Sequence, residues 1–188
     1  MGWAIAIIGG IILLILIFGV VSYNRFVSQR QLIKDAWANI DTELRRRYDL
    51  IPNLVESVRG YASHERTVFE NVTRARAAAA SATGSPAAQA AAEGPLVAAL
   101  RQLFAVVENY PDLKANQNFQ QLQSELSDIE NKLAAARRFF NNAVQEYNTG
   151  IQQFPAALFA ASLGFTPRTF FDVGEERAVV EKAPQVKF

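Results

Sequence analysis

The first apolar stretch of the chain contains no polar break. No charged or strongly polar side chain interrupts residues 3–21, which read WAIAIIGGIILLILIFGVV. As a helix that rises about 1.5 Å per residue, this stretch spans roughly 30 Å, the thickness of a bilayer's hydrocarbon core. Trp3 and Tyr23 flank the stretch, at positions where aromatic rings favour the membrane interface. The pattern predicts a transmembrane anchor over residues 1–22.

Two other interpretations of this stretch are a cleaved signal peptide and a buried core helix. A signal peptide has a basic segment, a shorter apolar stretch and a small-residue cleavage site. Here no basic side chain precedes Trp3, and the sequence from Gly19 to Ser22 is a poor cleavage site. A core helix of a small domain would carry a polar face. We therefore favour an uncleaved anchor.

A second pattern follows the anchor, in which apolar residues recur every three or four positions. This spacing places them on one face of a helix. The stripe keeps its phase across Pro52, which favours a kink over a chain reversal, and continues more weakly past Gly60 into the alanine-rich residues 75–80. We expect one long kinked helix from about Phe26 to Ala80. The clearest part of the stripe comprises Ile33, Trp37, Ile40, Leu44, Tyr48, Ile51, Val55 and Val58.

Two clusters of helix-breaking residues interrupt the middle of the chain, at 83–86 and at Gly94-Pro95. We interpret residues 81–95 as an alanine-rich linker, in which residues 87–93 form either a short helical turn or a low-complexity loop. Pro95 suits the first turn of a following short helix. The apolar face of that helix consists of Leu96, Leu100, Leu103 and Val107.

A third stripe has heptad-like, coiled-coil spacing and lasts for more than four heptads. A helix of that length runs roughly 50–60 Å and can bury its narrow face only against another long helix. We therefore expect an all-α protein: a single N-terminal transmembrane helix followed by an elongated antiparallel three- to four-helix bundle over residues 23–171. The stripe comprises Phe119, Leu122, Leu126, Ile129, Leu133, Ala136, Phe140, Val144, Tyr147 and Ile151.

The pattern changes again after Gly150. Apolar residues between Phe154 and Phe171 lack a long period. They either cap one end of the bundle or form a contact surface, because exposed apolar patches usually mark interaction sites. Residues 172–188 carry mixed charges and form a C-terminal tail.

Composition narrows the chemistry that the chain can perform. It has no cysteine and a single histidine, which excludes thiolate catalysis, disulfides and sites that need two imidazoles. The net charge of +1 gives no basic face for a nucleic acid, and no phosphate-binding loop or hydrolase motif occurs. We expect no catalytic, cofactor-binding or metal-binding residues, no small-molecule substrate and no enzymatic activity.

Three groups of charged residues are candidate sites. His64 beside Glu65 could act as a general base, but no second partner is evident. Asp128 and Glu130 lie two positions apart on a helix and do not face each other. The cluster 45–49, which reads RRRYD, could bind anionic lipid or an acidic partner. We prefer pairing of this cluster with Glu125, Asp128 or Glu130 on another helix.

Several short segments occur in a characteristic order along the chain. They are RRYDLIPNLV at 46–55, GYASHE at 60–65, YPDLKA at 110–115, FQQLQ at 119–123, ARRFFN at 136–141, Tyr147-Asn148 and Phe154-Pro155. Together these segments resemble the signature of the LemA family, and the resemblance runs from about Tyr23 to Phe171. It implies a bacterial membrane protein with one N-terminal span and a helical-bundle domain, without enzymatic activity or established catalytic residues.

The sequence leaves two functional hypotheses open. The first is a scaffolding protein of the bacterial inner membrane that assembles with further copies of itself, helped by Gly9, Gly10 and Gly19 in the span. The second is a binding module that regulates a separate membrane protease or signalling partner, with residues 45–49 and the segment after Phe154 as its docking surface. The partners expected are the lipid bilayer, a second copy and a membrane protein.

The positive charges near the span give an orientation. Arg25, Arg30 and Lys34 follow it directly, and no side-chain cation precedes it. The positive-inside rule then favours the cytoplasm for the residues after the span.

Overall fold

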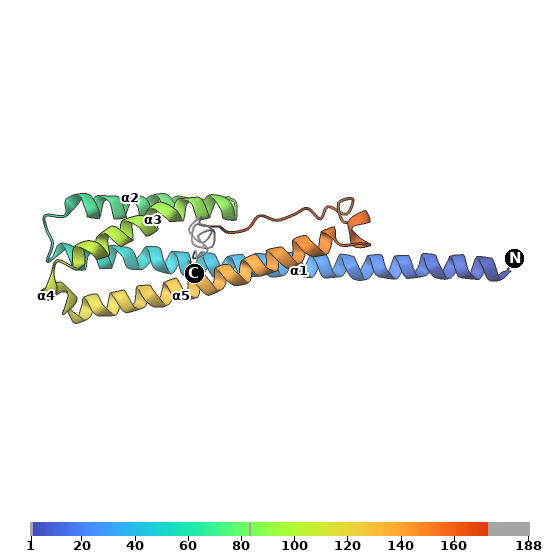
Figure 1. Ribbon diagram of the computed structural model, residues 1–188, viewed down its shortest axis with the longest axis horizontal. Coiled ribbons are helices and arrows are strands. Elements are labelled where there is room, and N and C mark those ends of the chain that lie inside the picture. The colour runs from blue at the N-terminus through green and yellow to red at the C-terminus, as the bar shows by residue number, and fades with distance from the viewer. Residues whose placement is uncertain (1, 83, 173–188) are drawn as a thin grey trace, which may run out of the picture. The chain divides into compact units, whose positions relative to one another are not determined.

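The computed structural model describes residues 2–82 and 84–172, and all regular secondary structure in them is helical. The all-α prediction is confirmed, whereas the expected tail is described only for Asp172. Figure 1 shows the helices in chain order. They are α1 (Gly2–Arg59), α2 (Arg66–Ser81), α3 (Pro86–Val107), α4 (Pro111–Lys114), α5 (Gln117–Gln152) and a short 3₁₀ turn at Ala156–Leu158.

The described residues divide into two compact units. The first unit combines residues 2–38 with 139–168, and the second combines residues 39–138 with 169–172. The long helices α1 and α5 each contribute to both units. Each unit has its own buried core and is described separately below.

The N-terminal part of α1 has the length and surface of a membrane-spanning helix. α1 and α3 are both long and apolar enough to cross a membrane, but they differ in burial. The most apolar window of α1 has no buried residue, whereas 39% of the window in α3 is buried. The large side chains in this N-terminal part of α1 are therefore exposed, as at Leu14 (67%) and Val20 (63%), while α3 is a core helix of its unit.

The first apolar stripe is buried as predicted, but the helix that carries it is shorter than expected. Pro52 lies inside α1 and is exposed, so the helix passes through it. α1 ends at Arg59, and α2 does not begin until Arg66. The prediction of one helix from Phe26 to Ala80 is therefore wrong.

A turn over residues 60–65 separates α1 from α2. The amides of Tyr61 and Ala62 both donate to the carbonyl of Val58, and Glu65 donates to Ala62. Ala62 is buried at 1% exposure, so the turn is packed against its unit. The apolar residues after Gly60 keep the spacing of a helix. This spacing alone does not show that a turn separates two helices.

The second unit is a four-helix bundle. It contains the end of α1, the start of α5 and a hairpin in which α2 and α3 lie antiparallel against each other (Figure 1). The Ser85 hydroxyl caps α3 by accepting from the amide of Ala88 at 3.2 Å. The largest fully buried apolar side chains of this unit are Ile40, Leu44, Ile51, Leu54, Leu96, Leu103, Leu113, Phe119 and Leu133.

The predicted linker at 81–95 is too long, because α3 begins at Pro86 and continues through Gly94-Pro95. Residues 87–93 are helical, which was one of the two alternatives, but the helix does not start at Pro95. A proline inside a helix costs about 3 kcal/mol. Here the alanine-rich first half of α3 favours helix, and Ala90, Glu93 and Leu96 are all buried. Tertiary packing on both sides of Pro95 thus holds the helix together across the breaker.

The predicted long helix with heptad spacing is confirmed as α5. The Asn116 side chain caps it by accepting from the amide of Phe119 at 3.1 Å. Its apolar stripe is buried, except that Leu122 and Ala136 are partly exposed.

α1 and α5 run antiparallel in each unit. In the first unit Trp37 packs on Phe140 at 5.5 Å between ring centroids. Phe26 lies against Gly150, where an added Cβ would meet the Phe26 ring at 3.3 Å. A glycine therefore favours the close approach of the two helices at this point, because a larger residue would require the Phe26 ring to shift.

The segment after α5 is buried at some of its apolar residues and exposed at others. Phe165 is buried in the first unit and contacts Tyr23 and Phe26, at 5.4 and 5.2 Å between ring centroids. Phe171 is buried in the second unit, beneath the guanidinium of Arg137. Other apolar residues remain exposed: Phe154 (82%), Leu158 (77%), Phe170 (46%) and Leu163 (45%).

Candidate functional site

A fully buried arginine lies at the centre of the second unit. Arg47 has no exposed surface. It lies on the apolar face of α1, three residues after Leu44 and four before Ile51, so helical periodicity turns it into the core. Its neighbours Arg45 and Arg46 lie on the exposed side and pair with Asp41 and Glu43 on the same helix. The basic cluster of the sequence is thus divided between core and surface.

Two carboxylates from different helices form ion pairs with Arg47. Glu93 of α3 is also fully buried and forms an ion pair with the Arg47 guanidinium. Glu130 of α5 pairs with Arg47 Nη1 at 2.8 Å and is partly exposed. Isolated charges in a protein interior are very costly, so this arrangement ties α1, α3 and α5 together.

Neutral groups complete the cluster. The Tyr48 hydroxyl donates to Glu93 Oε1. The Gln89 amide nitrogen lies within hydrogen-bonding distance of Tyr48 Oη (3.0 Å), Glu93 Oε1 (3.3 Å) and the carbonyl of Ala79 (3.1 Å). The contact with Ala79 extends the network to α2. All four long helices of the unit therefore meet at one polar site.

Burial raises the pKa of Tyr48, because a phenolate is poorly solvated in the core. The positive charge of Arg47 and the hydrogen bond from Gln89 oppose this increase in part. The phenol thus stays protonated and acts as a hydrogen-bond donor. It does not have the lowered pKa that a nucleophile or base requires.

A surface pocket of about 380 Å³ lies beside the cluster. Tyr48 and Gln89 belong to its lining, but their polar groups are already occupied within the cluster. The charged residues of the lining have both signs, which gives no preference for an anion or a cation. They are Asp41, Arg45, Asp49 and Arg76.

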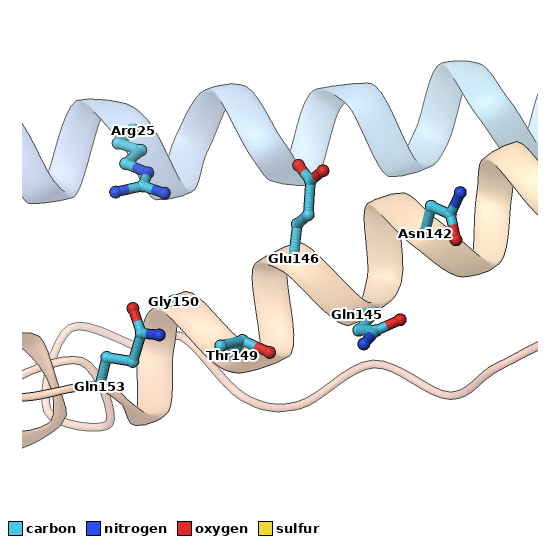
Figure 2. A pocket seen from close by; sticks show the side chains of 7 residues that line it. All are labelled: Arg25, Asn142, Gln145, Glu146, Thr149, Gly150 and Gln153. Atoms are coloured by element: carbon cyan, nitrogen blue, oxygen red, sulfur yellow. The ribbon is translucent and has the colours of Figure 1, made fainter.

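A second, more open pocket lies in the first unit and is shown in Figure 2. It has a volume of about 430 Å³ and lies between α1 and the last turns of α5. Arg25 extends from α1 toward α5, and Glu146 extends from α5 toward α1. Its other lining residues are neutral: Asn142, Gln145, Thr149, Gly150 and Gln153. One cation and one carboxylate on a polar surface can hold a polar group, but they form no nucleophile–base pair.

The other charged candidates do not form a site. His64 and Glu65 lie in the turn before α2 and not on a helix as predicted, and His64 is exposed. Asp128 pairs with Lys132 on its own helix at 2.6 Å. Within residues 2–82 and 84–172, no group of three or more histidine, aspartate or glutamate side chains is placed to hold a metal ion.

Of the predicted partners of the basic cluster, Glu130 is the correct one. The sequence did not single out Glu93, and it marked Asn148 only as part of the family resemblance. Glu93 lies three residues from both Ala90 and Leu96 on the buried face of α3, so its spacing was the available signal. Asn148 holds the C-terminal segment through two hydrogen bonds to the backbone of Arg168, at 2.7 and 2.8 Å. No local pattern indicates that contact.

Loss of the buried cation should destabilise the second unit strongly. We expect Arg47→Met to lower the free energy of unfolding by about 3–5 kcal/mol, because Glu93 would remain buried without its partner. The matched control, Arg45→Met, removes an exposed pair and should cost less than about 1 kcal/mol. Denaturant unfolding of the full chain in mild detergent, followed by circular dichroism, measures both.

The double variant Arg47→Met, Glu93→Leu tests the cause of that loss. It should recover part of the lost stability, since no uncompensated charge remains in the core. Equal effects of Arg47→Met and Arg45→Met would contradict the structural role of the cluster.

Tyr48 should make the protein sensitive to alkali. Below about pH 10 the phenol is protonated in both states, and its contribution to stability is complete. Above that pH the unfolded chain loses the proton first, because the folded pKa is higher. The free energy of unfolding then falls as the pH rises toward the folded pKa.

Urea unfolding between pH 8 and 11 measures this effect. Tyr48→Phe should show a smaller fall than the parent, whereas Tyr61→Phe, at an exposed position, should follow the parent. Identical pH profiles for all three proteins would refute the assignment to Tyr48.

The sequence of the chain is similar to those of several known proteins. Magnetosome protein MamQ of Magnetospirillum gryphiswaldense is 25% identical over 174 residues, which cover 79% of this chain and 64% of MamQ. Magnetosome protein MamQ 2 of Paramagnetospirillum magneticum gives the same identity and coverage. Protein LemA of Metamycoplasma hominis is 23% identical over 159 residues, covering 84% of this chain and 73% of that protein.

The chain thus spans 64% of the length of the MamQ proteins that it matches. The sequence profile of the LemA family matches residues 36–188, which is most of the chain. That range contains both carboxylates of the buried cluster and Arg47 itself. The chain therefore belongs to the LemA family.

Proposed function

We propose that the protein is a membrane-anchored, non-enzymatic scaffold that assembles with further copies of itself in the bacterial cell membrane. The observation that carries the proposal is the fully exposed apolar part of α1, which has one face made of small residues. An exposed apolar helix associates with a bilayer, and a small-residue face allows a second helix to approach closely.

The anchor is supported by the boundaries of the apolar stretch. Its exposed side chains begin at Trp3 (73%) and continue to Val21 (61%). The length of this stretch matches the hydrocarbon thickness of about 30 Å. Tyr23 and Arg25 follow, and both types of side chain are stable at the headgroup level. A single pass through the membrane accounts for this order of residues.

The absence of enzymatic activity is proposed from the arrangement of the ionisable groups. Arg47 and Glu93 have the burial that active-site groups often have, but they neutralise each other. Tyr48 is held as a hydrogen-bond donor to the same carboxylate. Their interactions join helices, and the described residues around them offer no nucleophile with a base.

The assembly face consists of four small residues. With about 100° of rotation per residue in a helix, Gly2, Ala6, Gly9 and Gly10 fall within roughly a third of the circumference of α1. A Cβ added at Gly2, Gly9 or Gly10 would meet no atom within 4 Å. The face is therefore open to a neighbouring helix, and backbone contact there would stabilise a membrane dimer or larger oligomer.

A bulky residue on this face should disrupt assembly. We expect Ala6→Ile to weaken self-association of the full chain at least tenfold, because the side chain would separate the two helix backbones. Ala4→Ile makes the same change about 200° around the helix and should leave association intact. Single-molecule photobleaching in lipid vesicles at several protein-to-lipid ratios measures the subunit number.

Two results would count against the scaffold. A parent protein that is monomeric at every ratio would remove the basis for self-assembly. A single dominant crosslink to a different membrane protein in cells would instead support the regulatory binding module.

We also infer that the residues after the span face the cytoplasm, because Arg25, Arg30 and Lys34 follow it directly. Since the chain has no cysteine, Ser127→Cys places one thiol at an exposed position of α5. A membrane-impermeant maleimide should label this thiol only after the cells are lysed. Labelling in intact spheroplasts would show that these residues lie on the opposite side of the membrane and would contradict the inference.

A further inference from the structure

The segment that follows α5 lies against the end of the predicted membrane span. The rings of Phe159 and Phe18 pack edge to face, with 6.1 Å between their centroids. Phe18 belongs to the apolar stretch of α1 and lies about 6 Å along the helix axis before Ser22, which is buried. Further along α1, Phe165 contacts Tyr23. All of these residues belong to the first unit.

This contact fixes the depth of the segment relative to a bilayer. If Trp3 to Val21 spans the hydrocarbon core, Phe18 lies inside it, near its edge. Phe159 then lies at the same depth, and Phe165 lies at the level of Tyr23, where the interface begins. The chain between them must occupy the boundary between acyl chains and headgroups.

The surface of the segment suits that boundary. Residues 153–164 read QFPAALFAASLG and contain no charged side chain. Three of their large apolar side chains are exposed: Phe154 at 82%, Leu158 at 77% and Leu163 at 45%. Soluble proteins rarely group such residues on one short segment without a partner for them.

Several backbone amides of the segment also have hydrogen-bond partners within it, which suits an environment of low polarity. In a bilayer, backbone groups must find partners within the protein. The amides of Ala157, Leu158, Phe159 and Ala160 donate to carbonyls at positions 153, 155 and 156, and those of Leu163 and Gly164 donate to positions 159 and 161. The Ser162 hydroxyl donates to the carbonyl of Phe159 at 2.7 Å.

Cations lie on the side of the segment away from the span. The guanidinium of Arg30 lies over the Phe165 ring, 5.7 Å from its centroid. Arg168 follows the segment, and its backbone is held by Asn148. Arginines at this level can contact lipid phosphates while the apolar residues lie deeper.

We propose that residues 153–164 form a second contact with the lipid bilayer, inserted into its interface through Phe154, Leu158 and Leu163. The inference rests on the anchor in the proposed function, because Phe18 provides the depth. A lipid surface is favoured over a second copy, since Phe159 of the same segment contacts Phe18 of the span and a bilayer around the span would therefore reach the segment. The segment would hold the last turn of α5 at the membrane surface.

Single-cysteine variants of the full chain test this depth directly. Leu158→Cys is the test position, and its high exposure makes the substitution harmless to the core. Leu14→Cys reports the span, and Ser127→Cys reports an exposed residue of the second unit. Each variant is spin-labelled at its thiol, and the labelled protein is reconstituted in vesicles of phosphatidylcholine and phosphatidylglycerol. Power saturation then compares collisions with oxygen, which concentrates in lipid, and with a water-soluble nickel chelate.

The label at position 158 should resemble the one at position 14, with collisions that favour oxygen over nickel several-fold. The label at position 127 should show the opposite preference. The result at 158 should not change when the protein is diluted tenfold in lipid.

Three outcomes would overturn the proposal. Nickel access at position 158 equal to that at 127, with position 14 in lipid, would refute the second contact and leave the anchor intact. Shielding of position 158 from both reagents that disappears on dilution would identify a second copy as the occupant. Nickel access at position 14 would refute the anchor, and this inference would fall with it.

Discussion

A guanidinium without access to water must be neutralised inside the protein, and this requirement at Arg47 organises the second unit. Glu93 and Glu130 supply the charges from two other helices. With either carboxylate alone, one terminal nitrogen of the Arg47 guanidinium would lack its ion-pair partner. Transfer of an ion from water into the protein interior is costly. The relative positions of α1, α3 and α5 are thus limited to those in which these three side chains meet.

The same requirement explains features of the chain that oppose helix formation. α3 contains Gly94-Pro95 directly after the carboxylate that pairs with Arg47. Both residues disfavour a helix interior. The helix persists because Glu93 is fixed by Arg47 and Tyr48 on one side, while Leu96 is fully buried on the other. A local preference of a few kcal/mol is offset by contacts with residues more than forty positions away.

The first unit is organised by shape and apolar contacts. Gly150 lets α5 approach the Phe26 ring, and Phe165 closes the end of the same core. None of its buried side chains is charged among the residues described. Its outer surface is apolar along residues 3–21 of α1 and at the segment after Gln152, which is the surface expected at a membrane. The charged core and the apolar surface thus belong to different units.

Local pattern by itself determined the elements: the apolar stretch from Trp3 to Val21, the stripe on α1 and the heptads of α5 all follow from spacing within a few residues. Glu130 was also among the three carboxylates proposed as partners of the cluster 45–49, but the burial of Arg47 was not predicted. Only the tertiary structure decided that α1 ends at Arg59, that α3 crosses Pro95 and that Glu93 is the buried partner. The reason is that the spacing of apolar residues shows only which face of its own helix a residue occupies. The free energy that stabilises a helix across a proline, or that compensates a buried charge, comes from side chains distant in sequence.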